Sequence, residues 1–297
     1  MSDQRPALSR SLRHAGWLVA AMVASLALAS SVSAAGPQPP MDPMAIKAVG
    51  HVHGAAHARP RSSPNLVWHN GAILTSTVVQ SIFWGSSWGS PGDKISGLDK
   101  FYTGVGGTPY MNTNTEYTGT NGKVGSGVTY NGHVVDLSTG PTTVPSTATV
   151  QAEVSKVITN PVANAYYPVY VDLKRGSAGY CAWHSYGTVH GVTVEFGFFF
   201  NLDGDPGCDP GDTGTIHSQG LEAVANVSGH ELSETVTDPR DGGWWDRSGA
   251  ENADKCAWTF SGHVTIGGEA WQIQGNWSNA ANNAKSGYDK AGCIQTH

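Results

Sequence analysis

The chain has 297 residues, with 17 basic and 23 acidic side chains and a formal charge of −6. This length allows one large domain or two closely joined ones, with ample material for a core. The acidic balance argues against nucleic acid and anionic membrane surfaces as partners.

The first 34 residues have the pattern of a secretory signal peptide, which is a basic start, an apolar stretch at 17–28 and a small-residue cleavage site ending at Ala34. The apolar stretch is shorter than the roughly 20 residues that span a bilayer. We therefore expect a secreted protein, extracellular or periplasmic, with no membrane span. A mature chain starting near Ala35 has lost three arginines and one aspartate, which leaves 14 basic and 22 acidic residues and a charge of −8.

Residues 35–64 are rich in Pro, Ala and His, which is typical of a flexible leader or propeptide. A histidine tract here could bind metal loosely, with a solvated tail as the alternative; it comprises His51, His53 and His57. Residues 65–297 are predicted to form a single catalytic-like domain. Periodicity and β-branched content predict strands at 75–85, 124–137, 167–173 and 189–202, and helices at 93–102 and 146–160, with Ser146 as a cap.

A longer helix is predicted over about 218–237, because Ser218 can cap its start and Pro239 disfavours helical geometry at the residue before it. The helix contains His230-Glu231-Leu232-Ser233-Glu234. A spacing of four puts His230 and Glu234 on one side, opposite a stripe that contains two leucines. A solvated ion pair is the plain alternative. The apolar neighbours on the same side favour a second packing surface instead.

This run resembles the H-E-x-x-H signature of zinc hydrolases, with a glutamate in place of the second histidine. A catalytic zinc needs three protein ligands. We expect His230, Glu234 and Glu251 to be these ligands, with Glu231 as general base. Two carboxylates and one imidazole would neutralise the ion and acidify its water less than two histidines would, so a weaker hydrolase or another divalent metal is the alternative.

Other residues could support this site. Asp238 and Asp254 are reserve ligands, or outer-shell acceptors for the histidine. His184 is a further catalytic candidate, as an oxyanion donor or an extra ligand, and His217 could act likewise; packing roles are the alternative for both. The acidic loop Asp203 to Asp212 could bind calcium, with a solvated loop as the alternative.

The four cysteines of this exported chain predict two disulfides. Proximity in sequence favours Cys181 with Cys208 and Cys256 with Cys293. Residues 240–297 are rich in Trp and Gly and predict a subdomain of short strands and loops that closes the cleft. Exposed tryptophans there could stack on sugars, although most tryptophans are buried.

Several segments, in this order, resemble the EXORDIUM, or phosphate-induced protein, family and its bacterial relatives. They are Trp68 to Gly71, Ile82 to Gly85, Tyr180 to His184, His230 to Pro239 and Glu251 to Cys256. The resemblance implies a secreted or cell-wall protein with a zincin-like fold, a mixed β-sheet beneath a long metal-binding helix. Plant members often lack the full acidic motif, which is complete here.

Two functions follow as hypotheses. The first is a secreted zincin-like metalloendopeptidase that acts on an extracellular protein or peptide, with zinc as its cofactor. The second is a non-catalytic cell-surface or carbohydrate-binding protein, with cell-wall polysaccharide as a partner and a structural or vestigial metal site.

Overall fold

The computed structural model describes residues 45–47 and 65–297. All of them belong to one compact unit, residues 39–297. The expected signal peptide and most of the expected leader, with its histidine tract, lie outside the described residues.

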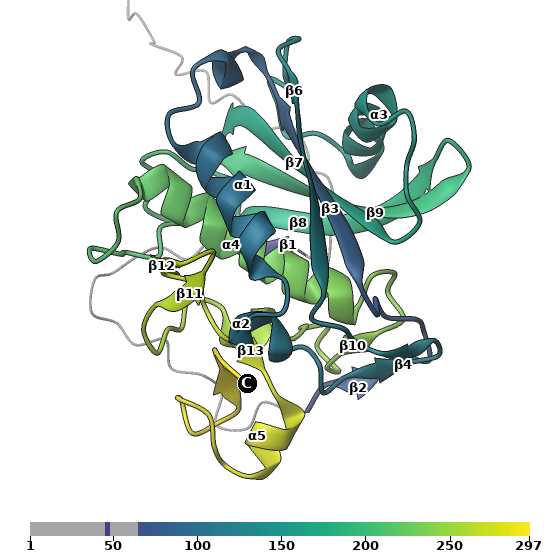
Figure 1. The fold of residues 1–297 in the computed structure, drawn as a ribbon, viewed down its shortest axis with the longest axis vertical. Helices are drawn as coiled ribbons and strands as arrows, with labels where there is room; N and C mark the ends of the chain where they lie inside the picture. Colours follow the sequence, from purple (N-terminus) through teal and green to yellow (C-terminus); the bar gives the residue numbers. More distant parts are fainter. Residues whose placement is uncertain (1–44, 48–64) are drawn as a thin grey trace, which may run out of the picture. The chain divides into compact units, whose positions relative to one another are not determined.

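A six-stranded mixed sheet forms the centre of this unit, in the order β1-β8-β9-β7-β3-β6 (Figure 1). Its strands are β1 (Ala45–Lys47), β3 (Thr77–Trp84), β6 (Val128–Asp136), β7 (Ala165–Lys174), β8 (Tyr180–Val189) and β9 (Val192–Asn201). Strands β6, β3, β7 and β9 are parallel neighbours, whereas β8 runs antiparallel to both β9 and β1. The protein is therefore a mixed α and β fold.

Helices cover both faces of the sheet. The helices α1 (Lys94–Val105) and α4 (Gln219–Thr237) contact each other, and α4 packs on β7, β8 and β9. Helix α3 (Thr147–Val157) packs on the same three strands. Its Gln151 lies where a Cβ on Gly187 of β8 would point. Because successive strand residues point to opposite faces, His184, three residues earlier, faces away from α3 and toward α4.

Close approach of α1 and α4 depends on a glycine. A Cβ on Gly97 of α1 would lie 2.2 Å from a methyl carbon of Leu221 on α4. Both elements are buried at this crossing. Leu221, on the leucine side of α4, thus contacts α1 at this crossing.

The C-terminal part consists of short elements that follow α4. They are β10 (Trp244–Trp245), η2 (Asp254–Cys256), β11 (Val264–Ile266), β12 (Glu269–Trp271), β13 (Asn276–Trp277), α5 (Asn279–Asn283) and β14 (Cys293–Ile294). The remaining elements are β2 (Val67–Trp68), η1 (Ser86–Gly89), α2 (Pro109–Asn112), β4 (Thr118–Gly119) and β5 (Gly122–Lys123). Both predicted disulfides are confirmed, Cys181 with Cys208 and Cys256 with Cys293.

Most of the predicted helices and strands are confirmed, and so are the two predicted helix caps. The caps Ser146 and Ser218 both accept a hydrogen bond from the backbone N–H three residues later. Two strands of the central sheet were not expected from the sequence, and the first of them is β8. Residues 45–47 of the expected leader form β1, which pairs with residues 180–183 of β8.

The tryptophans of the described C-terminal part are mostly buried, which is the alternative to the sugar-stacking surface considered from the sequence. Trp258, Trp271 and Trp277 are buried, and Trp244 and Trp245 are half-buried. The ring of Trp245 also stacks on His69. Most of these tryptophans therefore stabilise the core and cannot stack on a sugar.

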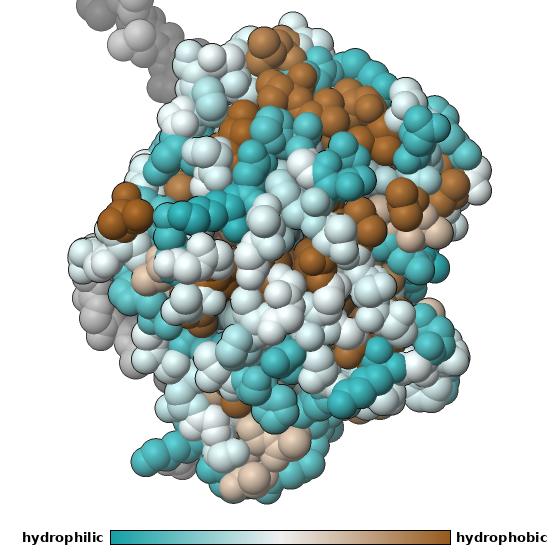
Figure 2. Space-filling model, viewed as in Figure 1, coloured by the Kyte–Doolittle hydropathy of each residue, from teal (hydrophilic) through white to brown (hydrophobic). Residues whose placement is uncertain are grey.

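Figure 2 shows apolar side chains gathered at the top of the view, near the end of β6. The exposed apolar residues at this end include Val135 and Leu137. Neither belongs to the candidate site described below. Among the described residues, no helix combines the length and apolar character needed to cross a bilayer.

Candidate metal centre

Helix α4 is the element on which the site is built. Every residue from Gly220 to Thr237 is buried, so the side of the helix that carries His230 and Glu234 faces protein. The spacing of four residues brings His230 Nε2 to 3.0 Å from Glu234 Oε1. The solvated pair considered from the sequence is therefore excluded.

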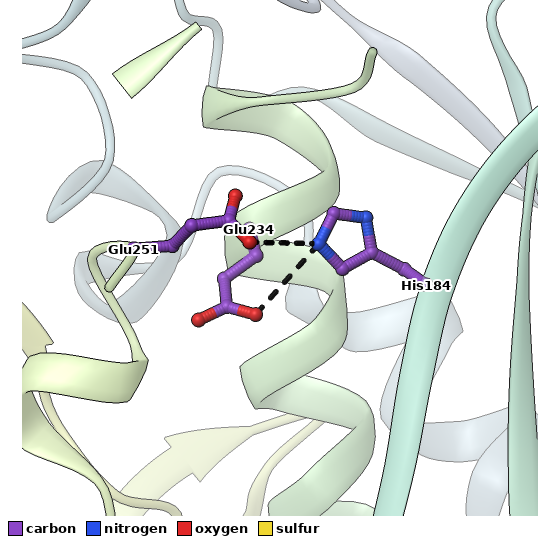
Figure 3. Close-up of side chains that lie close together, drawn as sticks. All are labelled: His184, Glu234 and Glu251. Atoms are coloured by element: carbon purple, nitrogen blue, oxygen red, sulfur yellow. Dashed lines mark hydrogen bonds and ion pairs between the residues drawn. The ribbon is translucent and has the colours of Figure 1, made fainter. Parts of the chain in front are cut away.

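Strand β8 contributes His184 from the sheet below. Its backbone pairs with Gly197 of β9, so the antiparallel ladder fixes the position of the histidine. Its Nε2 lies 3.2 Å from Glu251 Oε2 and 3.7 Å from Glu234 Oε2 (Figure 3). The sequence prediction left His184 as a supporting residue, but the structure places it among the central ones.

The segment before η2 contributes Glu251 and Asp254. The backbone N–H of Asp254 donates to Glu234 Oε1 at 2.9 Å, and that of Glu251 donates to Asp254 Oδ2 at 3.3 Å. The segment is tied to the C-terminal part by the Cys256–Cys293 disulfide and by the N–H of Trp277, which donates to the Asn252 carbonyl at 2.8 Å. These contacts hold the segment against the last turns of α4.

Two overlapping sets of residues could hold a metal ion. One consists of His184, Glu234 and Glu251, and the other of His230, Glu234 and Asp254, with ligand atoms within 4.8 Å of one another in each set. Glu234 is common to both. The expected ligands His230, Glu234 and Glu251 are thus all present, but the structure divides them between the two sets.

Burial makes charge unfavourable throughout this cluster. It lowers the pKa of His184 to about 3 and that of His230 to about 4. Burial also raises the pKa of Glu234 and Glu251 well above the usual range, and the charge of Glu234 adds to the effect on Glu251. A divalent cation would reverse this balance, because it stabilises ionised carboxylates and binds neutral imidazole.

Unsatisfied polar atoms support the fit to a cation. Glu234 Oε2, Glu251 Oε1 and His184 Nδ1 are buried without a hydrogen-bond partner in the described part of the chain. Such atoms cost free energy unless a ligand engages them. One imidazole and two carboxylates are donors that zinc and other divalent ions accept in proteins.

The residues of this cluster differ in their exposure. His184, His230, Glu231, Glu234 and Glu251 are buried, whereas the Asp254 side chain is 22% exposed. Among these six residues, Asp254 is therefore the one that is partly open to solvent.

Glu231, the expected general base, lies close to the cluster. Its carboxylate makes a smaller contribution to the raised pKa of Glu251, after burial and the nearer carboxylates. Glu231 precedes Glu234 by three residues, which places the two side chains ~60° apart around the helix axis, on neighbouring sides of α4.

Two other expected residues lie outside both sets. Asp238 accepts a hydrogen bond from the N–H of Gly243 at 2.7 Å, and burial raises its pKa to about 6. His217 is bound between Glu222 and Glu269, at 2.5 and 3.2 Å, and stacks on Trp271. His217 is therefore a packing residue that joins α4 to β12.

The acidic loop before α4 does not form a shared cation site in the described structure. Asp203 pairs with Lys94, Asp205 with Arg175 and Asp212 with His263. The fourth carboxylate, Asp209, accepts from the N–H of Gly211 within its own turn. Because each carboxylate has a separate partner, none of them belongs to a set that could hold a metal.

Gln274 and Asn226 are site residues that sequence reasoning missed. Gln274 Nε2 lies 2.9 Å from His230 Nδ1, and its backbone N–H donates to Asn226 Oδ1 at 2.9 Å. Asn226 precedes His230 by four residues, so the helix period could have placed it on the histidine side. No local pattern marks Gln274, because its contact with α4 is purely tertiary.

Comparisons with protein-family models, with curated proteins and with solved structures find no match to this chain. The resemblance to the EXORDIUM family therefore stays a prediction.

Proposed function

We propose that this protein is a secreted metal-dependent hydrolase whose divalent ion, zinc first among the candidates, is held by His184, Glu234 and Glu251. The convergence of one imidazole and two carboxylates from three separate chain segments carries the proposal. Burial removes the solvent that would stabilise the ionised carboxylates, and a bound cation would compensate for this lost solvation.

The hydrolytic part of the proposal rests on Glu231. A divalent ion in such a site supplies Lewis acidity and lowers the pKa of bound water. Glu231, beside the ligand set on α4, is suited to accept a proton from attacking water. Because two carboxylate ligands neutralise the ion, we expect slower hydrolysis than with two histidines.

A peptide is the proposed substrate, on a zincin-like scaffold. The arrangement that supports this is a helix with an H-E-x-x-E run packed on a mixed sheet. The two disulfides support an oxidising compartment and so secretion. Membership of the EXORDIUM family is part of the same proposal and rests on the segments quoted above.

One observation favours a second function, a non-catalytic surface protein with a structural metal. All three proposed ligands are buried. Structural metal sites are closed, whereas catalytic ones keep an open position. Carbohydrate binding is the weaker part of this alternative, because three of the five C-terminal tryptophans are buried.

Metal analysis of the purified mature protein, combined with digestion of a peptide library, separates these functions. We expect one divalent ion per wild-type chain and none in Glu234→Gln. Glu231→Gln should keep the ion and lose roughly 10²–10⁴-fold in hydrolysis, which is the usual contribution of a general base. The matched control is Glu153→Gln, a buried carboxyl on α3 across the sheet.

The outcomes exclude one another. A wild-type protein without stoichiometric metal contradicts both functions. Metal without any turnover supports the structural alternative. Turnover that survives in Glu231→Gln assigns the base to another residue.

A further inference from the structure

The orientation of the Gln274 side chain is fixed by two backbone groups. Its Oε1 accepts from the N–H of Trp258 at 3.1 Å, and its Nε2 donates to the carbonyl of Ala253 at 2.9 Å. A backbone N–H can only donate and a carbonyl can only accept. If the amide were turned over, its NH₂ group would face the N–H of Trp258 and its oxygen would face the carbonyl of Ala253. The NH₂ group of Gln274 must therefore face His230.

This orientation determines which nitrogen of His230 carries the proton. Gln274 Nε2 lies 2.9 Å from His230 Nδ1 and has only hydrogens to offer, so Nδ1 acts as the acceptor. A neutral imidazole has one N–H, which must then be on Nε2. This nitrogen lies 3.0 Å from Glu234 Oε1 but makes no hydrogen bond within the described structure.

A nitrogen that carries a proton has no lone pair for a metal. A ligating histidine normally donates its other N–H to an acceptor, which is the reverse of the arrangement found here. The set His230, Glu234 and Asp254 therefore lacks an available imidazole, although its atoms are close together. His184 has no such restriction, because its Nδ1 has no hydrogen-bond partner in the described structure.

We infer that His230 does not bind the metal. Glu234 Oε1 faces His230 Nε2 and accepts from the N–H of Asp254, which leaves Oε2 toward His184. Among the described residues, the imidazole ligand therefore comes from β8 and not from the H-E-x-x-E run. This inference rests on the proposed metal centre and reassigns one of the ligands expected from the sequence.

Nitrogen-15 NMR of the metal-free wild-type protein tests the tautomer directly. The side-chain shifts of His230 should show a protonated Nε2 and an unprotonated Nδ1, identified by loss of the signals in His230→Gln. A protonated Nδ1 overturns the inference. This measurement needs neither metal nor activity.

X-ray absorption of the zinc-loaded protein tests the ligand count. We expect one imidazole per zinc; two would overturn the inference. His184→Ala should abolish stoichiometric zinc binding. His230→Ala should keep one zinc per chain, with an affinity about 10–100-fold weaker, as is usual when an outer-shell partner is lost.

A matched control is His190→Ala, an exposed histidine in the turn after β8, which should leave zinc affinity unchanged. Complete loss of zinc in His230→Ala, with the fold intact by circular dichroism, contradicts the inference. If the wild-type protein binds no zinc or other divalent ion, the proposed function fails, and the nitrogen shifts still decide the tautomer.

Discussion

Removal of the Cys256–Cys293 disulfide should affect both the stability and the metal centre. This disulfide closes a separation of 37 residues that contains Gln274 and begins two residues after Asp254. The chain-entropy relation for a loop of this length gives a stabilisation of about 4 kcal/mol. For a folded region of this size, that corresponds to a fall in Tm of roughly 8–16 °C.

The change to make is the double substitution Cys256→Ser with Cys293→Ser. Its matched control is Cys181→Ser with Cys208→Ser, which opens a separation of 27 residues and should cost about 3.5 kcal/mol. The two variants should therefore have similar stabilities. Only the first should weaken metal binding, by roughly 10–100-fold, because it releases the segment that carries Glu251. His184 stays in place in the control, since the sheet ladder holds it.

Urea unfolding gives the two stabilities, and competition with a chromophoric chelator gives the two metal affinities. Equal loss of metal affinity in both variants would refute the reasoning. So would a destabilisation below about 1 kcal/mol in the first variant, because the entropic relation would then not describe this loop.

Two further predictions concern stability alone. Burial opposes ionisation of Asp212, but hydrogen bonds from His263 and from nearby turn residues outweigh it and lower its pKa to about 2. Because the pKa of Asp212 is lower in the folded state, its ionised carboxylate stabilises the fold at pH values above its ordinary pKa of about 4. Asp212→Asn should therefore be less stable than wild type at pH 5. Urea unfolding should show this difference vanish as the pH falls from about 4 to 2. Gly243→Ala should lower the free energy of unfolding by about 1–3 kcal/mol, because its Cβ would lie 2.1 Å from the Thr237 carbonyl oxygen. Gly127→Ala, with open space around its Cβ, is the control; equal effects of the two substitutions would contradict the packing argument.

The sequence predicted the elements whose patterns are local. Residues 75–85 and 146–160 gave β3 and α3 because a run of β-branched residues and a capped 3.6-residue period are visible in a short window. Strand β8 was missed because its first half is buried on both faces and mixes aromatic, small and polar residues. Its place in the sheet is decided by pairing with β9, not by its own composition.

The candidate site was predicted in part, for the same reason. His230 and Glu234 share a helix, so their proximity follows from the period alone. His184 and Glu251 are 67 residues apart and meet only in the folded chain. The part played by Gln274 depends on two backbone groups from other segments and has no signature in the sequence.

Strand β1 has a consequence for how the chain should be handled. A sheet edge with unpaired N–H and C=O groups invites pairing with other chains, and natural proteins protect such edges. Residues 45–47 cover the outer side of β8 opposite residues 180–183, immediately before His184. Processing that removed these three residues would turn β8 into an edge strand. A cut after Lys47 should therefore raise the aggregation tendency of the protein, and a truncation for expression is better placed before Ala45.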